Sequence, residues 1–371
     1  MLTKFEVENF KNFGEPLIFD LKQTNGYEFN KECLVKGIVN KAIVYGYNGV
    51  GKSNLGFAIL DLISHLTDRQ KGERSYKNYL YAGSNCNMAV FKYNFSLESG
   101  EVSYEYGKSD FETLIYEKLT INNQEFASID RRKNNTAFIN ASGAETLKRD
   151  LGDTLISIIP YIKNNSVLEE NTNNSCFNEF MTFVNGMLFF RSLDQNHYIG
   201  FEQGANGIES DIIEKNNVKN FETFLNEAGI ICKLTVVKGE DKTYLAFDFN
   251  GKKINFSDVA SQGTKSLALF YYWYQRLVTP DSKVTFLFVD EFDAFYHYSL
   301  SILVIKMLKD IKAQVIVTTH NTSVMTNDLL RPDCYFFIDG AGVHSLSNST
   351  EKELRAAHNI EKMYRAGAFG G

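Results

Sequence analysis

The stretch AIVYGYNGVGKS, residues 42–53, decides the predicted fold and contains the first candidate site. Ala42–Tyr45 is a short apolar run typical of a buried strand, and Asn54–Leu66 has the pattern of a helix, so Gly46–Ser53 is predicted to be the turn between them. Glycines at 46, 49 and 51 allow successive backbone N–H groups to point into one concavity, where phosphate oxygens bind beside the positive end of the helix dipole. The stretch therefore predicts an α/β fold with a phosphate-binding loop.

Two side chains of this loop have predicted roles of their own. Lys52 would reach the β- and γ-phosphates of a nucleotide, and the hydroxyl of Ser53 would bind Mg²⁺. The predicted nucleotide-binding residues are Gly46, Asn48, Gly49, Val50, Gly51, Lys52, Ser53 and Asn54. The alternative is a strand-to-helix turn that binds nothing, which the flanking strand and helix disfavour.

A second apolar run ends in two carboxylates. Val284–Val289 is typical of a parallel strand covered on both faces, and Asp290 and Glu291 follow it directly. We expect Asp290 to act on the metal's water shell and Glu291 to polarise the attacking water as general base. An Asp-Glu pair also favours helix starts, so capping of the next helix is the alternative. The phosphate-binding loop upstream favours the catalytic interpretation.

Two further motifs follow the same logic. Gln314–Thr318 is an apolar strand that leads through Thr319 to His320, whose neutral imidazole could hydrogen-bond a γ-phosphate at the carboxyl end of the sheet. A histidine after a strand is by itself more often a polar loop residue, and the order of the motifs favours the catalytic role. The motif SQGT at Ser261–Thr264 precedes an apolar helix predicted over Leu267–Leu277, so Ser261 would cap that helix with or without a ligand.

In this order, the motifs resemble the Walker A, signature, Walker B, D-loop and switch-histidine elements of ABC-type ATPases. The elements are Gly46–Ser53, Ser261–Thr264, Asp290–Glu291, Asp293 and His320. The likeness is greatest to the soluble branch with the SMC proteins, RecF and the overcoming-lysogenisation-defect (OLD) ATPases, and within it to free-standing, OLD-like AAA-family defence ATPases of bacteria. The opening segment FEVENFKNF, residues 5–13, resembles that branch's first strand. The resemblance covers residues 1–110 and 230–371.

The resemblance implies an ABC-type fold that uses ATP and Mg²⁺ and hydrolyses ATP to ADP and phosphate. It assigns catalysis to Glu291, His320 and Lys52, metal binding to Ser53 and Asp290, the D-loop to Asp293, and contacts in trans with the ATP of another subunit to Ser261, Gly263 and Thr264. Gln262 replaces a commoner small residue in the signature. The glutamine that links the two lobes in this family has two candidates, Gln124 and Gln203.

The domain organisation is predicted from changes of pattern along the chain. Residues 1–140 and 228–371 are expected to form a discontinuous ATPase lobe, and residues 141–227 an inserted helical lobe. Alternating apolar residues over 88–126 predict an antiparallel β meander. Long coiled coils are excluded because no sustained heptad repeat occurs between 140 and 230.

Within the expected helical lobe, three segments have distinct patterns. Apolar residues from Leu147 to Ile159 predict a helix that Pro160 ends or kinks. The polar tract from Lys163 to Ser175 reads as a loop, and Ile208–Leu225 as a second helical run.

Composition narrows the class of protein. With a net charge of −6, the chain has no global positive field for nucleic acid. Short basic clusters are more often solvated loops than nucleic-acid contacts, and this chain has them at Arg69, Lys71, Arg74 and Lys77, and at Arg131, Arg132 and Lys133. Five cysteines without metal-ligand spacing are expected to be buried, reduced thiols. No apolar stretch approaches the roughly 20 residues needed to span a bilayer, which predicts a cytoplasmic protein.

These observations support one leading function and two alternatives. The leading hypothesis is an ATPase whose nucleotide-dependent assembly into a homodimer or higher homo-oligomer switches a partner effector, such as a toxin or nuclease, in bacterial anti-phage defence. We expect the effector chemistry to come from another chain, because the nuclease domain of OLD proteins is not expected here. The alternatives are a RecF-like, ATP-dependent DNA clamp in repair and, less favoured, an ABC transporter subunit.

Overall fold

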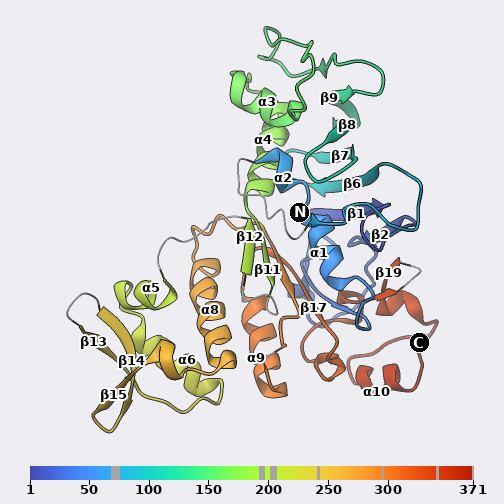
Figure 1. Cartoon of the computed structure of the whole chain (residues 1–371). Coiled ribbons are helices and arrows are strands. Elements are labelled where there is room, and N and C mark those ends of the chain that lie inside the picture. The colour runs from blue at the N-terminus through green and yellow to red at the C-terminus, as the bar shows by residue number, and fades with distance from the viewer. Residues whose placement is uncertain are drawn as a thin grey trace.

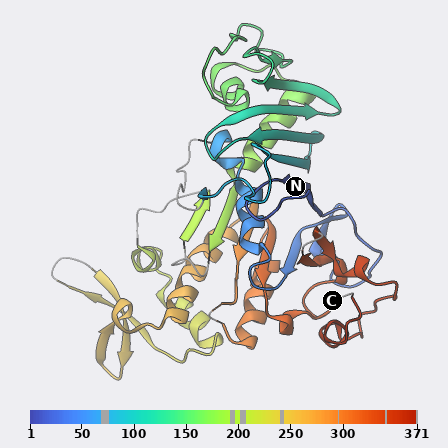
Figure 2. The same cartoon turned by 45° about the vertical axis from the view of Figure 1, so that its right-hand side comes forward.

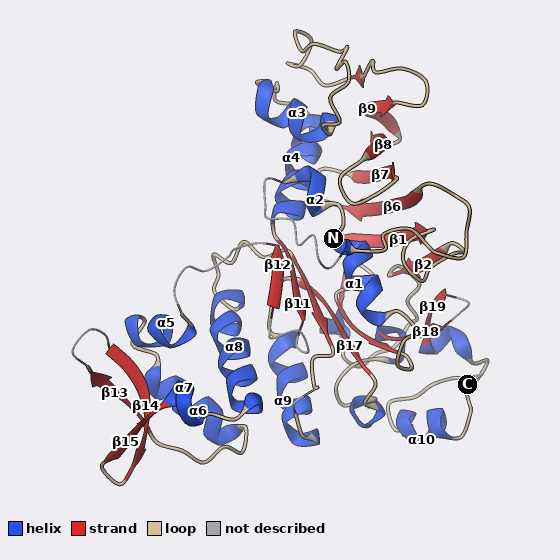
Figure 3. Ribbon diagram, in the orientation of Figure 1, coloured by secondary structure: helices blue, strands red, loops and turns tan. Residues whose placement is uncertain are grey.

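The computed structural model describes residues 1–67, 76–191, 197–200, 207–239, 243–294, 296–339 and 342–369. The fold is built on two large seven-stranded sheets, and a smaller lobe lies beside them (Figure 1). Helices pack on both large sheets, so the whole has the mixed α/β character that the sequence predicts (Figure 3).

The central sheet has the strand order β12-β11-β16-β17-β5-β18-β19. Its inner strands are parallel to one another, whereas β12 and β19 at the two edges are antiparallel to their neighbours. The strands are β5 (Lys41–Tyr45), β11 (Met187–Arg191), β12 (His197–Gly200), β16 (Phe286–Asp290), β17 (Gln314–Thr319), β18 (Tyr335–Asp339) and β19 (Gly342–Ser345). The strands predicted before Gly46, Asp290 and Thr319 are confirmed, and parallel pairing brings their carboxyl ends to one edge of the sheet.

Helices cover both faces of this sheet, because successive side chains of each strand point to opposite faces. On one face, Phe57 of α1 (Lys52–Leu60) packs against Phe189 of β11, with ring centroids 5.3 Å apart. On the other face, Phe190 packs against Trp273 of α8 (Gln262–Leu277) at 5.4 Å. The helix α9 (Tyr298–Lys309) lines the same apolar layer as α8. The helices α1 and α8 therefore lie on opposite faces.

The second large sheet is antiparallel and has the order β10-β9-β8-β7-β6-β1-β2. Its strands are β1 (Leu2–Glu8), β2 (Leu17–Asp20), β6 (Ala89–Ser96), β7 (Glu101–Lys108), β8 (Leu114–Ile121), β9 (Gln124–Asp130) and β10 (Phe138–Ile139). The predicted meander is confirmed, and β1, β2 and β10 extend it. Alternate residues of β6, such as Phe91, Tyr93 and Phe95, are fully buried, so one face of this sheet is an aromatic core.

The first helix beside the antiparallel sheet begins later than the sequence predicts. The prediction of a helix from Leu147 that ends near Pro160 is wrong, because α3 spans Ile158–Asn165 and has Pro160 in its first turn. Proline is tolerated in the first turn, since its missing N–H would have no intrahelical partner there. Leu155, counted in the predicted apolar face, is exposed.

The second helix lies partly in a tract predicted to be a loop. The helix α4 (Thr172–Asn185) begins within the polar tract from Lys163 to Ser175, and the side chain of Asn171 caps it. Polar residues at a helix start serve as caps, and the apolar face that stabilises α4 follows in Phe177 and Phe180. The loop prediction is therefore wrong for the end of this tract.

Residues 141–227 have three different surroundings rather than one. The helices α3 and α4 contact the antiparallel sheet, and β11 belongs to the central sheet. Among the described residues of this range, α5 (Ile208–Glu214) and α6 (Val218–Glu227) are the elements that belong to the small lobe. They pack there with α7 (Phe256–Val259), with α8, and with the sheet of β13 (Leu234–Lys238), β14 (Thr243–Phe249) and β15 (Lys252–Asn255). The small lobe projects to the lower left of the two large sheets in both Figure 1 and Figure 2. The segments of the expected helical lobe are thus divided among the antiparallel sheet, the central sheet and the small lobe.

Short elements complete the described chain: β3 (Leu34–Val35), β4 (Ile38–Val39), α2 (Ile63–Leu66), α10 (Ile360–Arg365) and 3-10 turns at Lys31–Cys33, Thr322–Val324, Pro332–Cys334 and Leu346–Ser349. The five cysteines are free thiols; Cys86 is exposed and Cys232 is partly exposed, against the expectation that all are buried. Among the described residues, no helix combines the length and apolarity needed to cross a membrane.

Candidate active site

The predicted phosphate-binding loop, Gly46–Ser53, connects β5 to α1. Gly51 has a φ of 114°, and a Cβ there would lie 2.6 Å from Nδ2 of Asn12. Gly46 approaches β18 so closely that a Cβ would lie 2.8 Å from Cγ2 of Ile338. Any larger residue at either position would displace the loop, so both glycines are required by the path of the backbone.

Asn12 holds the loop from outside and was not predicted as a site residue. Its Nδ2 donates to the carbonyl of Val50 at 2.9 Å, and its Oδ1 accepts from Nδ2 of Asn54 at 2.6 Å. Asn54, predicted to bind nucleotide, therefore braces the loop through Asn12. The only signal in the sequence is the position of Asn12 in the opening segment of residues 5–13.

Lys52 points into the loop. Its Nζ donates to the carbonyl oxygens of Gly46 at 2.8 Å and Tyr47 at 3.2 Å, and forms an ion pair with Oε1 of Glu291 at 3.2 Å. The side chain is 4% exposed. The ammonium group is therefore fixed between the loop and one of the two carboxylates at the end of β16.

Asp290 is buried beside the start of α1. Its Oδ1 accepts from Oγ1 of Thr318 at 2.8 Å, and its carboxylate lies beside the hydroxyl of Ser53. Burial raises the pKa of Asp290 above its usual value, and the nearby hydroxyl groups of Ser53 and Thr318 oppose that shift. A serine hydroxyl and a carboxylate are oxygen donors of the kind that Mg²⁺ takes together with substrate phosphates. The residues present therefore fit the metal.

Glu291 has a left-handed backbone, with a φ of 47°. This conformation costs a residue with a side chain roughly 1–2 kcal/mol. The Glu291 N–H donates to Oγ1 of Thr318 at 2.9 Å, and Oε2 lies 3.0 Å from Nδ1 of His320. The turn therefore places the Glu291 carboxylate between Lys52 and His320. Thr318 thus holds the Asp290 carboxylate and the Glu291 backbone, and it was not predicted as a site residue.

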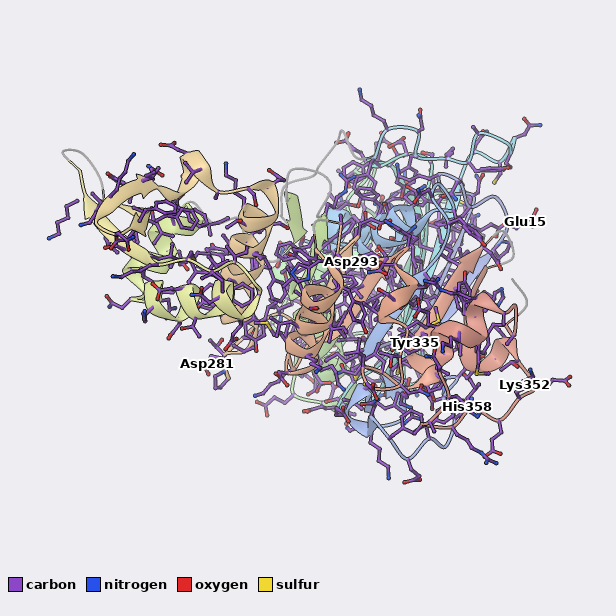
Figure 4. The ribbon with its side chains drawn as sticks, turned by 90° about the horizontal axis from the view of Figure 1, so that it is seen from below. Glu15, Asp281, Asp293, Tyr335, Lys352 and His358 are labelled. Atoms are coloured by element: carbon purple, nitrogen blue, oxygen red, sulfur yellow. The ribbon has the colours of Figure 1, made fainter. Side chains whose placement is uncertain are left out.

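Asp293 fixes the segment that carries His320. Its Oδ1 accepts from Oγ1 of Thr319 at 2.7 Å and its Oδ2 from Nδ2 of Asn321 at 3.0 Å. Burial raises the pKa of Asp293. Because both residues that flank His320 bind this one carboxylate, Asp293 positions the histidine within the same chain. Figure 4, a view from below, shows Asp293 between the small lobe and the C-terminal segment with Lys352 and His358.

The signature motif lies elsewhere in the same chain. Ser261 caps α8 by accepting from the N–H of Thr264 at 3.1 Å, and Gly263 is in the first turn. The helix α8 packs on the face of the central sheet opposite to α1. The structure thus brings Lys52, Ser53, Asp290, Glu291, Asp293 and His320 together, and places Ser261, Gly263 and Thr264 apart from them.

The remaining candidates from the sequence do not join this cluster. Gln124 lies at the start of β9 in the antiparallel sheet, where Asn173 donates to it at 3.4 Å. Gln203 lies outside the described residues, as do Arg69, Lys71 and Arg74, and Lys77 is exposed.

The basic side chains at 131–133 have partners within the fold. Arg131 donates to backbone carbonyls, and Arg132 and Lys133 form ion pairs with Asp130 at 2.7 and 3.6 Å. This agrees with the interpretation of the cluster as ordinary surface.

Fold and site together define a P-loop protein of the ABC-type ATPase branch. The chain belongs to the family described as "AAA domain, putative AbiEii toxin, Type IV TA system", whose profile matches residues 41–326. No curated protein matches the sequence.

Two solved structures are similar over most of the chain. The SMC head domain from Thermotoga maritima is 14% identical, with a TM-score of 0.43 over 93% of this chain and 98% of that chain. An SMC head bound to the C-terminal winged-helix domain of ScpA is 16% identical, with a TM-score of 0.46 over 93% and 97%.

Proposed function

We propose that this protein binds ATP with Mg²⁺ and hydrolyses it to ADP and phosphate. The supporting observation is the convergence of Lys52, Glu291 and His320 beside the Ser53 and Asp290 pair. Bound Mg²⁺ would neutralise charge that develops on the phosphates. Lys52 would exchange its carbonyl contacts for phosphate oxygens, which frees the Glu291 carboxylate to accept a proton from the attacking water. His320, held by its neighbours, would hydrogen-bond the γ-phosphate.

We further propose that a second copy of the chain completes the site. Ser261, Gly263 and Thr264 begin a helix on the face of the sheet opposite to α1, so they serve the phosphate loop of another subunit better than their own. Closure would then require ATP between two copies. This arrangement makes hydrolysis and self-association depend on each other.

The biological output that we propose is a change in how the closed and open forms hold a partner effector. The family description names a type IV toxin–antitoxin system, which supports a role in bacterial defence for this chain also. A ligand shifts a partner only through differential affinity for the two states. The partner would therefore be a toxin or nuclease protein whose affinity depends on nucleotide.

The decisive test replaces Glu291 by glutamine and, separately, Lys52 by alanine. Glu291→Gln should keep Mg²⁺–ATP binding but lower turnover by about 10²-fold or more, because the base is lost while the charge on Lys52 stays. Lys52→Ala should weaken ATP binding itself. Steady-state phosphate release and equilibrium ATP titration measure the two effects. Wild-type turnover in Glu291→Gln would remove Glu291 from this role.

The same Glu291→Gln variant tests self-association. Light scattering with ATP should show a persistent dimer or larger assembly, and without ATP a smaller species. A monomer whose hydrolysis rate per molecule does not change with protein concentration would refute the composite site. Salt-sensitive, ATP-dependent binding to duplex DNA would instead favour the repair clamp.

A further inference from the structure

Arg191, the last residue of β11, lies beside Asp290 although no motif indicates it. The parallel register of β11 and β16 pairs Arg191 directly with Asp290. Two residues before them, Phe189 and Phe288 meet edge to face with ring centroids 5.4 Å apart, and Phe189 packs on Phe57 of α1. Since strand side chains repeat their direction every second residue, Arg191 and Asp290 point to the face that α1 covers.

The guanidinium of Arg191 also contacts α1 directly. It lies 4.8 Å from the ring centroid of Phe57, a distance typical of a cation–π contact. Phe57 is four residues after Ser53, so it lies one helical turn further along the same side of α1. Arg191 therefore stands between the helix that presents Ser53 and the strand that presents Asp290.

The two carboxylates at the end of β16 lie beside different cationic side chains. Glu291 pairs with Lys52 at 3.2 Å. Arg191, the direct register partner of Asp290, supplies the second positive charge. Each carboxylate thus has a cation of its own, and the cation that serves Asp290 is anchored on α1.

We propose that Arg191 is a positioning residue for the Ser53 and Asp290 pair that would bind Mg²⁺. By stacking on Phe57 and attracting Asp290, its planar guanidinium holds α1 and β16 at the spacing that brings the hydroxyl and carboxylate together. The inference rests on the proposed ATPase function. A guanidinium also repels a metal ion, so the sign of the effect on metal affinity distinguishes positioning from simple repulsion.

The experiment measures ATP binding to the full chain across Mg²⁺ concentrations, and in EDTA. Arg191→Gln should raise the Mg²⁺ concentration for half-maximal ATP binding by about 10- to 100-fold, the usual effect of removing a partner behind a metal ligand. Binding of metal-free ATP should change little, because the phosphate loop is intact. Arg191→Lys keeps the charge but loses the planar stack, so it should be intermediate. In hydrolysis, the Mg²⁺ requirement should rise in the same order.

Arg132→Gln is the matched control. Arg132 also lies over an aromatic ring, at 4.5 Å from the centroid of Tyr116, and pairs with Asp130, but it lies in the turn that follows β9 of the antiparallel sheet. It should keep the wild-type Mg²⁺ dependence.

Two results would overturn the inference. One is a Mg²⁺ requirement in Arg191→Gln equal to or lower than that of the wild type. The other is an equal loss of ATP binding with and without Mg²⁺, which would indicate general damage to α1. If Arg191→Gln does not fold, the same criteria apply to Arg191→Lys. Failure of the proposed function is distinct, since the wild type itself would then bind no ATP at any Mg²⁺ concentration.

Discussion

Lys108 and Asp61 form an ion pair in which both side chains are 0% exposed, and Lys108→Met tests how firmly the antiparallel sheet holds α1. Lys108, at the end of β7, donates to Oδ2 of Asp61 at 2.9 Å and to Oγ of Ser64 at 2.7 Å. Asp61, which follows α1 directly, also accepts from the hydroxyl groups of Tyr79 at 3.0 Å and Tyr106 at 2.9 Å. The pair is therefore the polar joint between the phosphate-loop helix and the sheet.

The expected loss of stability follows from the charge that the substitution leaves behind. Removing one partner of a buried ion pair costs about 3–5 kcal/mol, because the other charge stays buried without compensation. Since two tyrosine hydroxyls still donate to Asp61, we expect the lower end, about 3 kcal/mol. The double variant Asp61→Asn/Lys108→Met should lose less than the sum of the two single losses, because both charges are then removed together.

Urea unfolding of the variants measures these losses. The matched control is Lys118→Met, which removes the partner of Glu125 in an ion pair of 3.0 Å on the same sheet, with side chains 52% and 36% exposed. An exposed pair of this kind contributes about 0–1 kcal/mol. A loss in Lys108→Met no larger than that of Lys118→Met would refute the reasoning, because burial would then not decide the contribution of the pair.

Two further predictions concern other contacts. Glu117 is buried, and burial raises the pKa of its carboxyl group above 4.5. The folded protein therefore holds the carboxyl proton to higher pH than the unfolded chain does. The resulting contribution to stability is present below pH 4.5 and is lost as pH rises through the raised pKa. The unfolding free energy of wild type minus that of Glu117→Gln should accordingly fall as pH rises from 4.5, as urea titrations at several pH values would show; an unchanged difference contradicts this. Tyr364 stacks on Phe337 and lies beside Tyr47 of the phosphate loop, so Tyr364→Ala, which removes the stacked ring, should weaken ATP binding by about 3- to 10-fold. Equilibrium titration checks this, and unaltered affinity would mean that Tyr47 needs no support.

The sequence predicts those parts of the candidate site that lie in contiguous segments with a recognisable pattern. The loop at 46–53 and the strands before Asp290 and His320 are contiguous segments whose glycines, apolar runs and terminal polar residues are visible in order. Arg191 was not predictable, because its position beside Asp290 depends on the pairing of β11 with β16. A four-residue apolar run such as Met187–Phe190 does not by itself distinguish a strand from a helix, which is also why β11 was not separated from the expected helical lobe.

The separation of α1 from α8 has a consequence for how a nucleotide signal could leave the site. The helix α8, which begins at the signature, contacts the small lobe in two places. Its Arg276 forms a bidentate ion pair with Asp211 of α5, and its Tyr271 packs on Phe221 of α6. Near its start, Ser266 lies 3.3 Å from the hydroxyl of Tyr296, in the segment that follows Asp293. A movement of Ser261 toward the ATP of another subunit would therefore carry α5 and α6 with it. Among the described residues, the small lobe is connected to the signature through α8 and would move with it. We therefore infer that the affinity of a partner bound to this lobe would change when two copies close on ATP.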